Sequence, residues 1–409
     1  MGKMERGQPE SLYACARLGA ALAAMTIGGA GMYAMAVALG PVQAEFGTDR
    51  GGASLPYTLT MLGFGFGGIL MGRLADRFGV AVPMMIGALG LGLGFIAAGN
   101  AQSLAQFALA HGLLIGFLGC STTFAPLVAD TSLWFNKHRG IAVAICASGN
   151  YLAGAVWPPI LQYFFDTAGW RATYVGIGLF SVAALMLLSL AMRLRPPALD
   201  AVDGTRRDDR HEKRLDLSPN ALMILLSVAG VACCVAMSMP QVHIVAYCGE
   251  LGYGAARGAE MLSVMLAAGI VSRLLSGWIS DHIGGLRTLL LGSALQGIAL
   301  LLFLPFNGLT SLYIVAGLFG LFQGGIVPAY ALIVREYFNP REAGARVGII
   351  LMGTLIGMAL GGWMSGWIFD LTGSYRAAFI NGIAFNLLNL TIALWLLRRA
   401  IQRHALFPA

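Results

Sequence analysis

The sequence predicts an all-α polytopic membrane protein with twelve transmembrane helices in two six-helix halves. Hydrophobic residues make up 57% of the 409 positions and charged residues only 11%, whereas a soluble domain typically carries about 25% charged residues. Apolar runs of roughly 20 residues, the length that spans a bilayer, occur twelve times. One long polar stretch, residues 195–218, separates the first six runs from the last six.

The twelve predicted spans follow one another at short intervals. They cover residues 14–40, 54–73, 80–99, 103–129, 140–164, 172–194, 219–247, 256–280, 288–306, 310–335, 344–369 and 377–399. The polar stretch opens with Pro196 and Pro197 and is rich in charge. We therefore divide the chain into an N-terminal half (1–194), a cytoplasmic linker (195–218) and a C-terminal half (219–409).

The distribution of basic residues predicts the orientation. If both termini are cytoplasmic, the outside segments hold only Arg50, Arg171, Arg257 and Arg376, and the other loop arginines and lysines lie inside. An excess of Lys and Arg in cytoplasmic loops sets the orientation of membrane proteins. The same asymmetry accounts for the net charge of +7, so this charge does not indicate nucleic-acid binding. We expect a monomeric protein in a lipid bilayer, with both termini and the linker inside.

The two halves resemble each other in sequence. GRLADRFG at 72–79 matches GWISDHIG at 277–284, and DTAGWRATY at 166–174 matches DLTGSYRAAF at 370–379. Both pairs are separated by about 205 residues, which is typical of an internal duplication. Duplicated transport proteins bind their ligand between the repeats, near the middle of the membrane, and the sequence predicts a site of this kind.

One loop carries a recognisable motif. Gly72-x-x-x-Asp76-Arg77-x-Gly79, between the second and third spans, resembles the signature loop of the major facilitator superfamily, and Gly277 and Asp281 repeat it in the second half. We expect the glycines to allow a tight turn and a close approach of helices. Asp76 is expected to cap a helix and Arg77 to pair with Asp76. These residues are predicted to act in gating.

A narrower resemblance concerns the segment that enters the fifth span. WFNKHRG at 134–140 is similar to the corresponding segment of monocarboxylate transporters, and residues 337–375 resemble the eleventh span of bacterial members. Those members import small organic acids together with protons. The resemblance implies a proton-coupled monocarboxylate symporter of a bacterial inner membrane, working by rocker-switch alternating access. The identity of the acid, the direction of flux and the choice between proton coupling and exchange stay open.

Arg273 is the first candidate site residue. It lies inside the eighth predicted span, at the position of the family's arginine, and Gly269 stands where the family has an aspartate. An arginine within a span usually lines the bundle interior or a water-filled path, and its planar guanidinium matches a carboxylate. No Asp or Glu falls in the middle of any predicted span. We predict that Arg273 binds the substrate carboxylate. The alternative is a structural arginine that bonds backbone carbonyls or extends toward the inner membrane surface.

His243, in the seventh span, is the second candidate. A histidine changes charge near physiological pH, so we assign proton coupling to His243 together with Arg273, and substrate binding to both. A helix-end histidine bonded to a neighbour is the alternative, and His111 is interpreted as structural. Polar and aromatic side chains in other spans add substrate-binding candidates, although such residues also serve helix packing: Tyr33, Thr122, Asn150, Gln323 and Tyr330.

Other function classes find little support in the sequence. It shows no zinc-ligand spacing, phosphate loop or catalytic triad, so we expect neither a cofactor nor a metal site nor an enzyme. An efflux antiporter of amphiphilic compounds is the alternative transporter, but such proteins usually carry an embedded acid. A membrane sensor would normally carry an added soluble domain. Gly353, Gly357 and Gly361 in the eleventh span predict a close-packing helix face.

Overall fold

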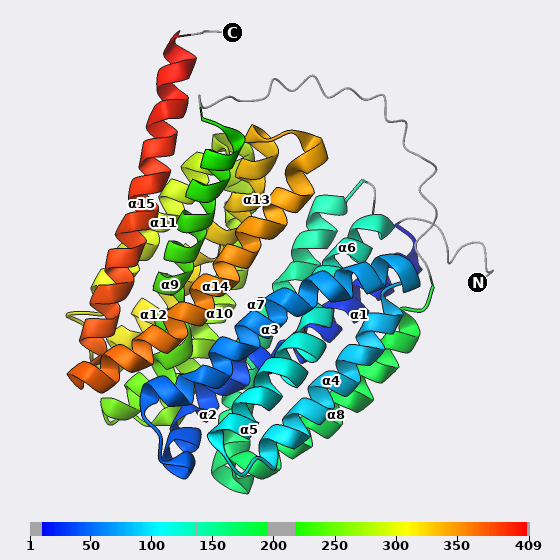
Figure 1. Ribbon diagram of the computed structural model, residues 1–409, viewed down its shortest axis with the longest axis vertical. Helices are drawn as coiled ribbons and strands as arrows, with labels where there is room; N and C mark the ends of the chain where they lie inside the picture. Colours follow the sequence, from blue (N-terminus) through cyan, green and yellow to red (C-terminus); the bar gives the residue numbers. More distant parts are fainter. Residues whose placement is uncertain (1–9, 136, 195–216, 407–409) are drawn as a thin grey trace. The chain divides into compact units, whose positions relative to one another are not determined.

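The computed structural model describes residues 10–135, 137–194 and 217–406, which form helices joined by short turns (Figure 1). Within this part of the chain, twelve helical segments are long and apolar enough to cross a bilayer. The predicted all-α fold class with twelve spans is therefore confirmed. At the first span the prediction ends at residue 40, whereas the helical segment ends at Phe46.

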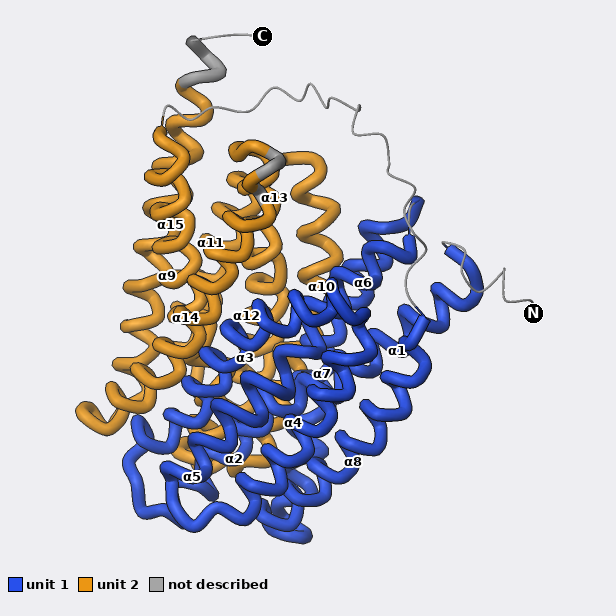
Figure 2. Tube along the Cα trace, turned by 45° about the vertical axis from the view of Figure 1, so that its right-hand side comes forward, with its two compact units in different colours: residues 1–207 blue, residues 208–409 orange. Residues whose placement is uncertain are grey.

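The chain forms two compact units, residues 1–207 and 208–409 (Figure 2). The division falls inside the predicted linker 195–218, of which residues 195–216 lie outside the described part of the chain. The first unit contains α1 (Leu12–Gly28), α2 (Ala30–Phe46), α3 (Arg50–Phe78), α4 (Ala81–Gly99), α5 (Leu104–Leu109), η2 (Ala110–Gly119), η3 (Cys120–Thr123), α6 (Ala125–Trp134), α7 (Arg139–Ala168) and α8 (Trp170–Ala191).

The second unit begins at α9, where the Ser218 hydroxyl accepts the Ala221 N–H as an N-cap and Pro219 occupies the first helical turn, an arrangement that favours helix initiation. Its helices are α9 (Pro219–Glu250), α10 (Ala255–Ile283), α11 (Gly285–Leu302), α12 (Leu309–Gln323), α13 (Ile326–Tyr337), α14 (Pro340–Thr372) and α15 (Tyr375–Leu406). In this unit α9 packs against α14 and α15, and α10 packs against α12.

The fourth and tenth spans are each interrupted. In the fourth span, the helix loosens to a π-helix over Ala110–Gly119 and then tightens to a 3-10 turn over Cys120–Thr123. In the tenth span, α12 ends at Gln323 and α13 starts at Ile326, with Gly324 and Gly325 between them. A proline lies in the first turn after each interruption, Pro126 and Pro328, where a helix tolerates it because the missing N–H would have no intrahelical partner. Interrupted spans at corresponding places in two repeats are typical of transporter binding regions.

The predicted glycine face of the eleventh span is confirmed. A Cβ added at Gly357 would lie 2.4 Å from the Val231 carbonyl oxygen, and one at Gly361 would lie 2.5 Å from that of Val235. Any larger side chain at these positions would therefore push α14 away from α9. In a membrane the hydrophobic effect does not drive helices together, because the lipid is itself apolar. Close backbone approach of this kind instead stabilises the contact through van der Waals packing.

Candidate functional site

Arg273 lies on the packed side of α10 rather than on its apolar outer face. Successive residues of a helix are rotated by about 100°, so residues seven apart lie on nearly the same side. Leu266 is buried seven residues before Arg273, and Ser280 is buried seven residues after it. The exposed apolar residues of α10 lie at least about 100° around the helix from Arg273; they include Val271, Leu274, Leu275 and Trp278. The Arg273 side chain is itself half-buried.

The helix that carries Arg273 packs directly on the interruption of the tenth span. A Cβ at Gly324 would lie 2.5 Å from the Gly269 carbonyl oxygen and 2.8 Å from the Ser272 Cβ, and one at Gly325 would overlap the Ser276 side chain. Only glycine allows this approach, because backbone atoms cannot retreat as a flexible side chain can. The sequence neighbours of Arg273 are thus fixed against the Gly324–Gly325 break.

A pair of glutamines lies at the same break. The Gln241 Nε2 of α9 donates to the Gln323 Oε1 of α12 at 3.1 Å. Both side chains are buried, with 8% of Gln241 and 0% of Gln323 exposed. Among the described residues, nothing accepts a hydrogen bond from the Gln323 Nε2. Gln323 was predicted from the sequence, whereas Gln241 was not, although it directly follows Pro240 in a polar stretch of the seventh span.

His243 is fully buried between α9, α14 and α15. Its Nε2 lies 2.8 Å from the Gly362 carbonyl oxygen, and its Nδ1 lies 3.2 Å from the Tyr375 hydroxyl oxygen. A carbonyl can only accept, so the neutral ring carries its proton on Nε2 and accepts from Tyr375 at Nδ1. His243 thus joins three helices of the second unit.

Two other predicted residues have structural partners. The Tyr330 hydroxyl donates to the Asn389 Oδ1 at 2.9 Å, and the Asn389 Nδ2 donates to the Ser293 Oγ at 2.7 Å, in a fully buried polar network. The Thr122 hydroxyl donates to the Gly119 carbonyl at 2.8 Å, and its side chain packs against Gly87 of α4. Helix packing therefore accounts for both side chains without a substrate.

The remaining predicted residues lie in the first unit. Tyr33 is buried in α2. Asn150 of α7 is half-buried, and its amide oxygen would lie 3.7 Å from a Cβ at Gly29. The structure thus gathers Arg273 and Gln323 around one break of the second unit, whereas Tyr33, Thr122 and Asn150 belong to the first unit.

Comparisons with known proteins identify the family. A profile described as Major Facilitator Superfamily matches residues 20–310 and 261–408. The chain belongs to the Major Facilitator Superfamily. It is 28% identical to monocarboxylate transporter 13 of Rattus norvegicus over 292 residues, which are 71% of this chain and 67% of that protein. It is 25% identical to the agnestins efflux protein AgnL12 of Paecilomyces divaricatus, over 68% of this chain and 62% of that protein.

Solved structures share the superfamily fold. A bacterial homologue of the human lysosomal transporter Spinster, crystallised in an inward-facing and unoccupied conformation, superimposes with a TM-score of 0.69. The match covers 95% of this chain and 96% of that chain at 15% sequence identity. At this identity the likeness concerns the fold. The chain is therefore a transporter of the superfamily that resembles monocarboxylate transporters in sequence.

The superfamily signature loop has its predicted turn but not its predicted ion pair. Gly79 ends α3 with a φ of 84°, a conformation that favours glycine. The Arg77 guanidinium lies over the Phe78 ring at 5.1 Å, and the described residues show no ion pair between Arg77 and Asp76, both of which are exposed. The expected Arg77–Asp76 pair is thus not among the ion pairs of the described residues, and the Arg77 guanidinium lies beside a ring instead.

The expected close approach at two signature glycines is also wrong. Gly72 and Gly277 lie inside α3 and α10, and a Cβ at either position would meet no described atom within 4 Å. In the second copy the turn is made by Gly284, whose φ is 80°. Asp281, near the end of α10, is exposed. The Glu336 carboxylate of α13 instead accepts the Gly285 N–H at 2.8 Å, at the start of α11.

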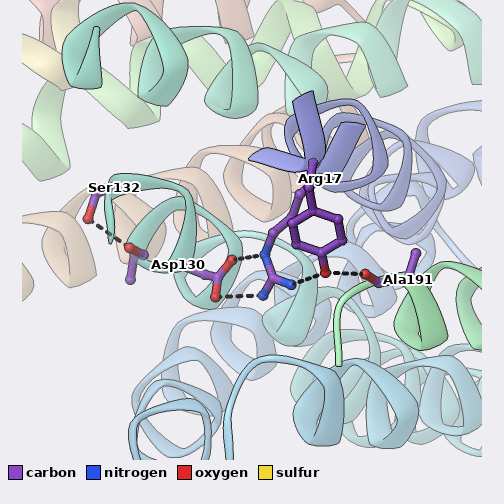
Figure 3. A network of polar contacts seen from close by, with 6 residues as sticks. Arg17, Asp130, Ser132 and Ala191 are labelled. Atoms are coloured by element: carbon purple, nitrogen blue, oxygen red, sulfur yellow. Dashed lines mark hydrogen bonds and ion pairs between the residues drawn. The ribbon is translucent and has the colours of Figure 1, made fainter. Parts of the chain in front are cut away.

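A buried ion pair of the first unit was missed in the sequence. The Arg17 Nε and Nη2 of α1 donate to the two Asp130 oxygens of α6 at 2.9 and 2.8 Å (Figure 3). The guanidinium also lies 4.8 Å from the Trp134 ring centroid and 3.3 Å from the Tyr13 hydroxyl oxygen, which donates to the Ala191 carbonyl. Arg17 and Asp130 fall at the same predicted membrane boundary with opposite charges, and this signal could have revealed the pair.

Proposed function

We propose that this chain is a proton-coupled symporter of a small monocarboxylate, with Arg273 as the binding group for the carboxylate. The observation that carries the proposal is the placement of Arg273 on the packed side of a membrane-spanning helix, beside the Gly324–Gly325 break. The sequence similarity to monocarboxylate transporter 13 supports an organic-acid substrate. A guanidinium in a partly dehydrated site binds a carboxylate through two parallel charge-assisted hydrogen bonds.

The proton is assigned to His243. In the neutral state the ring accepts from the Tyr375 hydroxyl at Nδ1. Protonation at Nδ1 would reverse this hydrogen bond and place a positive charge where α9 meets α14 and α15. A charge change at a junction of three helices can alter how they pack. Together with substrate binding at Arg273, this would couple the proton to rocker-switch alternating access of the two repeats.

An efflux antiporter of amphiphilic compounds is the second candidate. The similarity to AgnL12, which is named an efflux protein, favours it. A transporter of amphiphiles would depend on apolar contact rather than on one cation. The Arg273 variants described below therefore separate the two candidates, because only an anionic substrate requires the guanidinium.

We also propose a bacterial inner membrane location, a monomeric state and cytoplasmic termini. The support for the orientation is the sequence asymmetry, in which few arginines lie in the predicted outside segments. A cysteine is introduced at position 205 of a variant from which the native cysteines have been removed. In intact cells this cysteine should not react with a membrane-impermeant thiol reagent. Labelling of that cysteine would contradict the orientation.

Binding to Arg273 variants tests the proposed function. Arg273→Gln removes the charge but keeps a polar side chain, and we expect organic-acid binding to weaken by at least about tenfold, or about 1.4 kcal/mol. Arg273→Lys should recover only part of the loss, because an ammonium lacks the planar fork. Calorimetry on the folded variants and uptake into vesicles measure both effects. If Arg273→Gln binds and carries the acid as the parent does, the carboxylate site is wrong.

A further inference from the structure

The basic nitrogen of His243 is covered by a hydroxyl group. The His243 Nε2 lies 2.8 Å from the Gly362 carbonyl oxygen, which can only accept, so this nitrogen carries a proton whether the ring is neutral or charged. The nitrogen that can gain a proton is therefore Nδ1, and the Tyr375 hydroxyl oxygen lies 3.2 Å from it. A proton reaches Nδ1 either through this hydroxyl or after Tyr375 has moved.

A tight turn fixes the position of Tyr375. The helix α14 ends at Thr372, and Gly373 follows with a φ of 64°, a conformation that favours glycine. The Ser374 hydroxyl oxygen then accepts the Arg376 N–H at 3.1 Å, a capping contact that favours helix initiation. Tyr375 is the first residue of α15, so the turn places its hydroxyl at the point where α14 and α15 meet α9.

The Tyr375 ring lies between His243 and the end of α9. It is 2% exposed, and its centroid lies 5.5 Å from that of His243, 4.5 Å from that of Phe369 and 5.7 Å from that of Tyr247. Tyr247 is half-buried, and Glu250 at the end of α9 is exposed. The predicted orientation places this end of α9 outside. Tyr375 thus lies on the outward side of the buried histidine.

The charged side chains near this contact lie at its outer border. Glu250 of α9, Asp370 of α14 and Arg376 of α15 are all exposed. Of the titratable groups on α9, Tyr247 contacts the Tyr375 ring, whereas the Cys248 thiol donates to the Met261 sulfur of α10 at 3.3 Å. The Tyr375 hydroxyl is therefore the titratable group in direct contact with the His243 Nδ1, and the charged groups are further out.

We propose that Tyr375 relays the coupled proton to His243. Its hydroxyl proton passes to the His243 Nδ1 while its oxygen takes up a proton from the outer side. One O–H bond breaks and another forms on the same oxygen, and one N–H bond forms on the ring. The net change is one positive charge on the imidazole. The inference rests on the proposed function, in which His243 carries the proton, and it makes Tyr375 a positioning residue that acts through His243.

Three roles of the Tyr375 hydroxyl predict three different results. A relay needs the hydroxyl, because a proton moves only between groups within hydrogen-bond reach. A hydroxyl that merely covers Nδ1 would slow protonation, so its removal would leave proton-driven uptake unchanged or make it faster. A packing contact would affect all modes of transport alike, whatever the pH gradient.

Tyr375→Phe is the test, because it removes the hydroxyl and keeps the ring that packs against Phe369 and Tyr247. The full-length protein is reconstituted in vesicles with an organic acid that the parent carries. We expect uptake driven by a pH gradient to fall by about fivefold or more. Equilibrium exchange of the same acid should stay within about twofold of the parent's rate, and this retained exchange also shows that the variant is folded.

Tyr174→Phe is the matched control in the first unit. Tyr174 is fully buried, and its hydroxyl oxygen lies 3.3 Å from the His111 Nε2. This variant should change driven uptake and exchange by the same factor. Tyr375→Phe combined with His243→Ala should lower driven uptake no further than His243→Ala does, because a relay has no effect without the group that it serves.

Three results would overturn the relay. Unchanged or faster driven uptake in Tyr375→Phe would make the hydroxyl a cover, and equal loss of driven uptake and exchange would make it a packing contact. Losses that multiply in the double variant would assign Tyr375 and His243 to separate routes. A parent without any uptake driven by a pH gradient would instead reject the proposed proton coupling itself. A loss in His243→Ala but not in Tyr375→Phe would reject the relay alone.

Discussion

The two units each place an arginine away from the helix surface that faces lipid, but in different surroundings. In the first unit, Arg17 is 4% exposed at the start of α1 and meets both oxygens of Asp130, which is 7% exposed. In the second unit, Arg273 lies well inside α10, and the nearest acids along that helix, Glu260 and Asp281, lie toward its two ends. One arginine is thus part of a bidentate ion pair at a helix end, and the other lies deep in a span.

This difference leads us to interpret Arg17 as a structural charge and to propose Arg273 as a functional one. The Arg17–Asp130 pair joins α1 to α6, and the neighbouring Tyr13 hydroxyl extends the contact to the Ala191 carbonyl of α8. A buried pair stabilises a fold mainly in the sense that removing one partner leaves the other charge uncompensated. Arg273 instead lies beside an interruption of a neighbouring helix, where irregular backbone is typical of transporter sites. The same substitution in the two units should therefore have opposite consequences.

The largest expected effect follows from exchanging each arginine for glutamine. Arg17→Gln leaves the buried Asp130 carboxylate without its cation, so we expect the free energy of unfolding to fall by about 3–5 kcal/mol. Arg273→Gln removes the proposed carboxylate-binding group from a half-buried position, so we expect organic-acid binding to be lost with a smaller fall in the free energy of unfolding than Arg17→Gln causes. Thermal unfolding in detergent measures the first quantity and calorimetry the second.

A double variant sharpens this comparison. Arg17→Met combined with Asp130→Leu removes both charges and keeps apolar volume, so it should recover most of the stability that either single variant loses. Substrate binding by the double variant should match the parent. The comparison fails if Arg17→Gln unfolds no more easily than the parent, or if Arg273→Gln destabilises the protein as strongly as Arg17→Gln does.

The fold could be read from the sequence because each span depends on a local property. An uninterrupted apolar run of roughly 20 residues has the length that spans the hydrocarbon core of a bilayer. Within that core a helix forms all the backbone hydrogen bonds inside the segment itself. The interruptions of the fourth and tenth spans were not predicted. Gly119 and Gly324 are only two of 56 glycines, and the composition of a span does not indicate where its hydrogen-bond register changes.

The site was less accessible to sequence reasoning because side-chain partners are set by tertiary contacts. Arg17 and Asp130 are 113 residues apart, and each looks like an ordinary residue at a membrane boundary. Thr122 and Tyr330 look like cavity residues, yet packing against Gly87 and a hydrogen bond to Asn389 account for them. Arg273 stood out because a charge inside a span is rare whatever surrounds it.

The two buried histidines extend the comparison between the units. His111 lies in the π-helix of the first unit, where its Nδ1 is 3.2 Å from the Thr60 hydroxyl oxygen and its Nε2 is 3.3 Å from that of Tyr174. The Thr60 hydroxyl donates to the Pro56 carbonyl, so in this arrangement the His111 Nδ1 donates to Thr60 and Nε2 accepts from Tyr174. His243 differs because one of its partners is a backbone carbonyl of another helix.

The smallest expected effect concerns these histidines. His243→Ala should lower pH-gradient-driven uptake by about tenfold, or about 1.4 kcal/mol, while equilibrium exchange of substrate changes much less, because exchange does not require the proton site to cycle. His111→Ala should lower the thermal stability and affect both transport modes equally, since its partners Thr60 and Tyr174 belong to helix packing. Reconstituted vesicles, with and without a pH gradient, measure both modes on the same preparation.

Equal loss of the two modes in His243→Ala would assign this residue to binding or folding, and unchanged uptake would remove it from the mechanism. Either result would make the histidines of the two units alike and would remove His243 from the proposed proton coupling.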